Sequence, residues 1–137
     1  MKNHIIAAEI HWSDRNYCCG WACPGFGAVI VTARTMDDVK RVFESSLVRQ
    51  IDDMAAAGEE IPAWLAVKEY KIEYLIQVSA LLREASKYTS MANLSRITGI
   101  NQKLLSNYAS SVKIPRESQK RKIIDGLHEI GRACLML

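Results

Sequence analysis

Side chains suited to acid–base or metal chemistry are present in this sequence, but they are not grouped. His4, His11 and His128 have no serine, cysteine or aspartate beside them in a recognised catalytic motif, and no glycine-rich phosphate loop occurs. Catalysis by acid–base groups or by two metal ions requires converging carboxylates or a positioned histidine. The acids of the first half instead fall on the outward face of an expected helix or at alternating strand positions: Asp37, Asp38, Glu44, Asp52, Asp53, Glu9 and Glu73. We therefore expect no enzyme activity and no catalytic residues.

The four cysteines, Cys18, Cys19, Cys23 and Cys134, raise the question of a zinc site. Zinc is usually held by about four ligands supplied as paired C-x2-4-C knuckles. Only Cys19 and Cys23 have that spacing, and the adjacent Cys18 and Cys19 would point to opposite faces of a strand. We expect buried free thiols in a reducing compartment, with no metal and no other cofactor.

A nucleic-acid interface is better supported by the residue pattern. Residues 91–108 have the spacing of a helix-turn-helix motif, in which Gly99 is the expected turn glycine. Ser95 is small enough for two helices to cross closely, and Asn101 can cap the second helix. The apolar positions of the motif are filled by Leu94, Ile100, Leu105 and Tyr108.

The side chains expected to contact DNA lie on the second helix of this motif and beside it. Outward-facing polar residues can read base edges, while flanking cations neutralise backbone phosphates. The full set is Arg96, Gln102, Lys103, Ser106, Asn107, Tyr108, Lys113 and Arg116. The alternative is a plain helical hairpin with a solvated basic face.

Charge is divided unevenly along the chain. Residues 1–80 hold 8 Lys/Arg against 11 Asp/Glu, a net charge of −3, whereas residues 81–137 hold 10 against 4, a net charge of +6. A basic piece favours a polyanion, and an acidic piece suits a basic protein or a solvated surface. No apolar run approaches the roughly 18 residues of a membrane-spanning helix, and Glu9 interrupts a start that could resemble a signal peptide. We expect a cytoplasmic protein that does not enter membranes.

The length of 137 residues, with 49% hydrophobic and 24% charged side chains, suits one compact domain or two small folded lobes. Period-two patterns predict strands at residues 5–12, 17–22, 27–33 and 70–78. Thr35 followed by Asp38 resembles a capping box, and the apolar spacing after it predicts a helix that ends at Gly58. The first lobe, residues 1–79, is therefore expected to have the order β-β-β-α-β.

The second lobe, residues 80–137, is expected to be entirely helical. Apolar periodicity places helices near residues 80–87, 91–98, 102–110 and 118–135. The last of these has more apolar positions than so small a lobe can cover, so we expect it to form a dimer contact. The residues of that contact are Ile123, Leu127, Ile130 and Leu135. The expected fold class is α+β.

Four segments of the two lobes form a recognisable set: the turn Cys23-Pro24-Gly25-Phe26-Gly27, then Thr35 to Lys40, Met54 to Leu65, and the tail Leu94 to Arg132. With these segments the chain resembles a HicB-type antitoxin of bacterial type II toxin–antitoxin systems. The tail is the most specific part, with RITGIN, LLSNYA, Pro115 and LHEIGR in that order. It is similar to the helix-turn-helix branch of the family.

The resemblance implies a first lobe with a degenerate ribonuclease-H-like fold and no nuclease activity. This lobe would bind and inhibit a HicA-type toxin, a small basic protein that cleaves mRNA. The second lobe would bind operator DNA in the promoter of its own operon, as a homodimer or higher homo-oligomer. An acidic first half and a basic second half suit that division. Two alternatives are a stand-alone helix-turn-helix transcription regulator with an N-terminal ligand- or protein-sensing lobe, and a degenerate nuclease.

Overall fold

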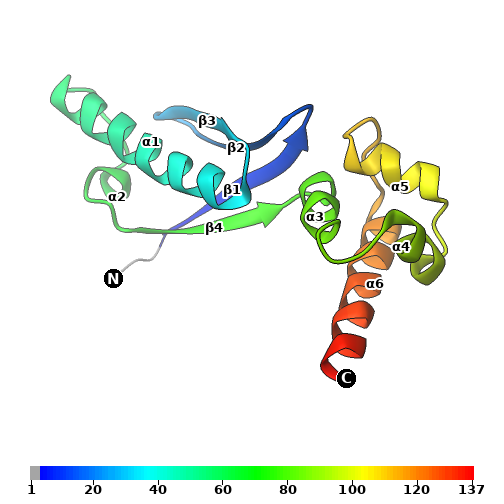
Figure 1. Cartoon of the computed structure of the whole chain (residues 1–137). Helices are drawn as coiled ribbons and strands as arrows, with labels where there is room; N and C mark the ends of the chain where they lie inside the picture. Colours follow the sequence, from blue (N-terminus) through cyan, green and yellow to red (C-terminus); the bar gives the residue numbers. More distant parts are fainter. Residues whose placement is uncertain (1–3) are drawn as a thin grey trace. The chain divides into compact units, whose positions relative to one another are not determined.

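The computed structural model describes residues 4–137 and has an α+β fold (Figure 1). Four strands of the described chain form one mixed sheet: β1 (His4–Ser13), β2 (Asn16–Cys23), β3 (Gly27–Ala33) and β4 (Tyr70–Ile76). The helices are α1 (Met36–Ala56), α2 (Ala63–Ala66), α3 (Val78–Ala85), α4 (Met91–Thr98), α5 (Gln102–Ala109) and α6 (Glu117–Leu135). None of these helices is both long enough and apolar enough to cross a membrane.

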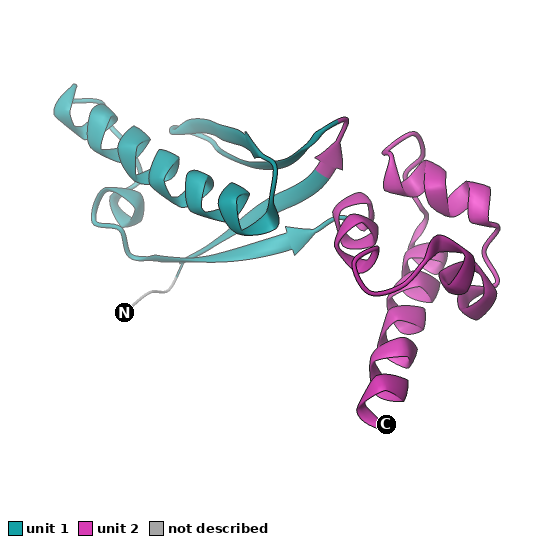
Figure 2. Ribbon diagram, in the orientation of Figure 1, with its two compact units in different colours: residues 1–11, 15–77 teal, residues 12–14, 78–137 magenta. Residues whose placement is uncertain are grey.

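The chain forms two compact units (Figure 2). The strand unit contains the described residues up to His11 together with Arg15–Gln77, and the helical unit contains Val78–Leu137 and also Trp12–Asp14. The sequence pattern predicts a boundary between residues 79 and 80, with the whole first hairpin in the N-terminal lobe. The tip of that hairpin instead belongs to the helical unit, because Trp12 hydrogen-bonds to residues at the start of α3 and after α5.

The sheet has the order β3-β2-β1-β4, in which β1 pairs with β4 in parallel and β2 pairs with β3 antiparallel. Ile6, Ala8 and Ile10 of β1 are fully buried, whereas Ala7 and Glu9 between them are exposed. Successive side chains of a strand point to opposite faces, so one face of the sheet is core and the other is open. Helix α1 packs on the core face against β2 and β3 (Figure 1).

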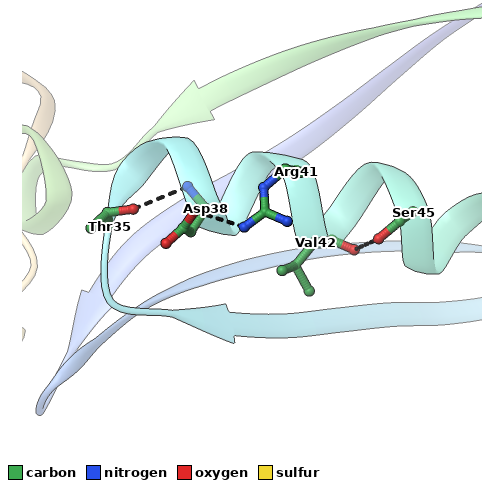
Figure 3. Close-up of polar contacts among 5 residues, drawn as sticks. All are labelled: Thr35, Asp38, Arg41, Val42 and Ser45. Carbon is green, nitrogen blue, oxygen red and sulfur yellow. Dashed lines mark hydrogen bonds and ion pairs between the residues drawn. The ribbon is translucent and has the colours of Figure 1, made fainter.

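Helix α1 begins and ends where its sequence predicts. The amide of Asp38 donates a hydrogen bond to Thr35 Oγ1 at 3.1 Å, and Arg41 donates to the Asp38 carboxylate at 2.8 Å (Figure 3). The contact with Arg41, followed by that with Thr35, lowers the pKa of Asp38. Gly58, at φ +74°, follows the helix and donates its amide to the carbonyl of Ala55. The buried face of α1 consists of Val39, Phe43, Leu47 and Ile51.

Burial in the strand unit strongly shifts the pKa of two side chains. Cys19 is fully buried, and this raises the pKa of its thiol to about 12. Burial also raises the pKa of Tyr74, and the hydrogen bond from its hydroxyl to the Glu44 carboxylate at 2.6 Å adds to the effect. Both side chains therefore stay neutral at ordinary pH and act as packing residues.

The cysteines are free thiols, as expected, but they are not all buried. Cys18 and Cys23 are partly exposed and Cys134 is exposed, so the expectation of burial is correct only for Cys19. Within residues 4–137, no group of three or more His, Cys, Asp or Glu side chains is placed to hold a metal ion.

The boundary between β4 and α3 differs from the one that the sequence predicts. Strand β4 ends at Ile76 and α3 begins at Val78, whereas the alternating pattern extended the strand to residue 78. Val78 and Leu82, one helical turn apart, are both buried in the core of the helical unit, and this packing overrides the strand propensity of valine. The short helix α2 was not predicted, because four residues carry no measurable periodicity.

The helical unit has its own apolar core. Helix α3 packs on α5, and α4 packs on both α5 and α6. The buried residues are Val78, Leu82, Leu94, Ile100, Leu105, Tyr108 and Ile123. Helices α4 and α6 approach closely at Gly126, where an added Cβ would lie 2.7 Å from Thr98 Cγ2. The glycine is required there by lack of space.

Gly126→Ala is therefore expected to lower the free energy of unfolding by about 1 kcal/mol, since overpacking costs about 1 to 3 kcal/mol and alanine regains about 1 kcal/mol of helix propensity. Gly131→Ala is the matched control, because its added Cβ would meet no atom within 4 Å beyond its chain neighbours and the nearby backbone of its own helix. The free energy of unfolding of this control should rise by about 0.5 to 1 kcal/mol. Urea unfolding followed by circular dichroism measures both, and Thr98→Ser should recover part of the loss in the double variant. Equal effects at the two glycines would contradict the close packing.

Candidate nucleic-acid interface

Helices α4 and α5 are joined by a short turn with capped ends. The amide of Asn93 donates to Ser90 Oγ at the start of α4, and the amide of Lys103 donates to Asn101 Oδ1 at 2.8 Å at the start of α5. Gly99 ends α4 in the left-handed conformation, with φ +75°. The cap and turn residues singled out in the sequence thus occupy the positions expected of them.

Side chains also tie the two helices together across the turn. Ser95 Oγ donates to the carbonyl of Ile100 at 2.5 Å. The Thr98 hydroxyl donates to the carbonyl of Leu94 at 2.7 Å and accepts from the amide of Ile100 at 3.2 Å. A hydroxyl at residue 98 therefore satisfies backbone groups that an aliphatic side chain would leave without these bonds. The angle between α4 and α5 is fixed by hydrogen bonds as well as by apolar packing.

The outward face of α5 carries most of the residues expected to contact DNA. Gln102, Lys103 and Ser106 are exposed, and Asn107 is half-buried. Tyr108 is only 6% exposed and packs in the core of the helical unit. Its assignment as a DNA-contacting residue is wrong, because the ring lies on the opposite side of α5 from Gln102 and Ser106. Tyr108 packs α5 against the core of the helical unit.

The predicted phosphate-binding cations lie on both sides of α5 in the sequence. Arg96 is exposed on α4, where its guanidinium donates to Asn93 Oδ1 at 2.6 Å. Lys113 and Arg116 are exposed in the segment that joins α5 to α6. The exposed Arg121 and Lys122 on the first turns of α6 add to this positive charge. An exposed helix face with adjacent cations can bind a phosphate backbone and present polar groups to base edges.

The segment after α5 contains a residue that the sequence analysis did not select. Ser111 has φ +64°, and its hydroxyl donates to the carbonyl of Trp12 at 2.5 Å. No local pattern predicts this contact, because the two residues are 99 positions apart. Lys113, two residues later, donates its amide to the carbonyl of Asn107 at 3.2 Å.

The residues expected to form a dimer contact fall into two groups on α6. Ile123 is fully buried in the core of the helical unit, so its assignment to the dimer contact is wrong. Leu127 and Ile130 are partly buried against the same core. Leu135 is 87% exposed, and the following Met136 is 86% exposed. The last turn of α6 thus presents apolar side chains that the chain itself leaves uncovered.

Comparisons with protein-family models, with curated proteins and with solved structures found no match to this chain.

Proposed function

We propose that this protein is a HicB-type antitoxin that inhibits a HicA-type mRNA-cleaving toxin and represses its own operon by binding promoter DNA. The observation that carries the proposal is the capped α4–Gly99–α5 pair, with polar residues along the exposed face of α5 and cations beside it. We propose that this pair is a DNA-binding helix-turn-helix motif with α5 as the recognition helix.

The chemistry of α5 suits sequence-specific DNA. Glutamine and asparagine amides can bond to adenine edges, lysine can donate to guanine, and serine can bond to several bases. Gln102, Lys103 and Ser106 supply three of these groups on one exposed face. Lys113 and Arg116 are separated from this face by the end of α5, which suits contacts with the phosphate backbone. These roles make the helical unit the DNA-binding part.

The strand unit is proposed to bind the toxin. We infer a degenerate ribonuclease-H-like fold for it, supported by its β-β-β-α-β order and by the parallel pairing of β1 with β4. Asp37, Glu44, Asp52 and Asp53 are exposed along α1, and this gives a basic partner an acidic surface to approach. Exposed carboxylates that do not converge on one point suit electrostatic steering better than catalysis.

Assembly is proposed to use the end of α6. A helix-turn-helix protein that reads a palindromic site needs a twofold partner. Leu135 and Met136 are almost fully exposed, while Leu127 and Ile130 line the same helix closer to the core. Burying these side chains against a second copy would remove apolar area from water. We propose a homodimer or higher homo-oligomer held by this end of α6.

A stand-alone transcription regulator is the second candidate, and one feature of the strand unit favours it. The open face of the sheet has a hollow of about 440 Å³ above Gly20, within the volume range of small-ligand sites. Glu9, His11, Cys18 and Ile30 are among its lining residues. A small ligand bound there would make the strand unit a sensor instead of a toxin-binding domain. Both candidates require DNA binding by the helical unit.

DNA binding is tested by separating base contacts from phosphate contacts. Gln102→Ala should weaken binding to the DNA upstream of its own gene by about 1 to 3 kcal/mol and have little effect on a random duplex. Lys113→Ala should weaken binding to both and reduce the log–log salt slope by about one unit. Fluorescence titrations at several salt concentrations measure these effects. Equal losses on both duplexes for Gln102→Ala would remove α5 from sequence readout.

Assembly is tested at the exposed end of α6. Leu135→Glu should shift the mass in solution toward the monomer without altering the circular dichroism spectrum, because residue 135 contributes nothing to the core of its own chain. Ala133→Glu, at another exposed position of α6, adds the same single negative charge and is the control. Sedimentation equilibrium measures the mass. An unchanged mass for Leu135→Glu would rule out this end of α6 as the contact.

Toxin inhibition is tested in cells with the neighbouring gene. The full chain should restore growth when it is co-expressed with a short basic protein encoded next to it. The Lys113→Ala, Arg116→Ala double variant should restore growth equally well, because the proposed toxin surface lies on the strand unit. Calorimetry with the purified neighbour provides the binding control. Absence of binding by the wild-type chain would favour the stand-alone regulator.

A further inference from the structure

Ser111 occupies a backbone position that usually belongs to glycine. Helix α5 ends with the amide of Ser111 donating to the Tyr108 carbonyl at 3.2 Å and the amide of Val112 donating to the Asn107 carbonyl at 2.9 Å. This is the pattern of a Schellman motif, in which the left-handed residue is most often glycine. Gly58 fills the equivalent place after α1. A serine at φ +64° is less favourable than glycine and persists where its surroundings fix it.

What fixes Ser111 is its side-chain hydroxyl. Ser111 Oγ donates to the carbonyl of Trp12 at 2.5 Å, a bond that glycine cannot make. Trp12 is itself held on two other sides. Its amide donates to Ser79 Oγ at 2.9 Å, and the guanidinium of Arg83 lies 4.0 Å from the centre of its ring. Because Trp12 is only 8% exposed, it offers Ser111 a fixed acceptor.

Trp12 lies where the neighbouring chain leaves the sheet, because β4 ends at Ile76 and α3 begins at Val78. The amide of Gln77, between these two elements, donates to the carbonyl of Ile10 at 2.8 Å. Trp12 lies two residues further along β1, so its amide and carbonyl point to the same edge as those of Ile10. The chain has by then turned into α3, and hydroxyls of Ser79 and Ser111 take the place of a strand partner.

We propose that Ser111 and the backbone of Trp12 are positioning residues that hold the segment carrying Lys113 and Arg116 ready to bind DNA phosphates. This inference rests on the proposed DNA-binding function. The amides of Val112 and Lys113 both donate to the Asn107 carbonyl, so holding Ser111 fixes the backbone from which the Lys113 side chain extends. A fixed backbone reduces the entropy lost when that side chain binds phosphate. The tip of the first hairpin thereby helps to position the residues that contact DNA.

The test uses the full chain with Ser111→Ala and its neighbour Ser110→Ala. Both variants lose a hydroxyl, but Ser110 Oγ donates only to the Asn107 carbonyl at 3.3 Å. Amide hydrogen exchange at Val112 and Lys113 reports the order of the segment. Ser111→Ala should speed this exchange about three- to tenfold, the factor expected from loss of one ordinary hydrogen bond. Ser110→Ala should stay within about twofold of wild type, since its bond is long and exposed.

DNA affinity is measured with the same variants on the DNA upstream of the gene and on a random duplex. Ser111→Ala should bind both about three- to tenfold more weakly, because phosphate contacts are independent of sequence. If this variant does not fold by circular dichroism, Ser111→Gly replaces it, since glycine adopts φ +64° easily. Unchanged exchange in the variant would overturn the proposal, and so would faster exchange with wild-type affinity. Failure of the wild-type chain to bind either duplex would reject the proposed function, while the exchange data would still decide whether Ser111 holds the segment.

Discussion

Where a neighbouring strand ends, the amide and carbonyl groups at the strand edge need other hydrogen-bond partners. In this protein Trp12 lies at such a place. Strand β1 continues to Ser13, whereas β4 ends at Ile76. The hydroxyls of Ser79 and Ser111 supply the missing bonds, and the ring of Trp12 packs under Arg83. Unsatisfied buried backbone groups are costly, so this short stretch of strand belongs with the helices that complete it.

Backbone hydrogen bonds and close packing also determine how the helices of the helical unit are arranged. Thr98 bonds to two backbone groups at the end of α4, and its methyl group lies against Gly126 of α6. Helices α4, α5 and α6 are thus fixed by contacts that tolerate little change in side-chain volume. A rigid pair of helices is what a reader of DNA sequence needs, because base-edge hydrogen bonds depend on the placement of short polar side chains. The exposed groups of α5 are presented from this rigid support.

The strand unit differs from the helical unit because only one face of its sheet is packed. Its core is formed by α1 on one face of the sheet, where Cys19 and Tyr74 are packed in neutral form. The opposite face keeps Ile30 exposed at 71% and Leu75 at 45%, beside the acidic Glu9 and Glu73. A sheet with one core face and one open face leaves a surface for a ligand or a protein. In the stand-alone regulator this open face would bind a small ligand, whereas the proposed toxin surface is the acidic face of α1 on the other side of the sheet.

The elements with strong local signals could be predicted from the amino-acid sequence. Period-two alternation located the strands, the Thr35 cap and Gly58 bounded α1, and Gly99 with Asn101 marked the turn before α5. These features depend on neighbours within a few residues, and a single sequence contains that information. The exposed polar face of α5 followed from the same periodicity.

Which side chains are exposed, and where the two units divide, depends instead on contacts between distant segments. Tyr108 and Ile123 were expected at interfaces but are buried, because the helical unit uses them to complete its own core. Val78 begins a helix although it continues a strand pattern, since its burial with Leu82 outweighs its propensity. The bond from Ser111 to Trp12 joins residues 99 positions apart. Local patterns carry no record of such contacts, because they arise only when distant segments pack together.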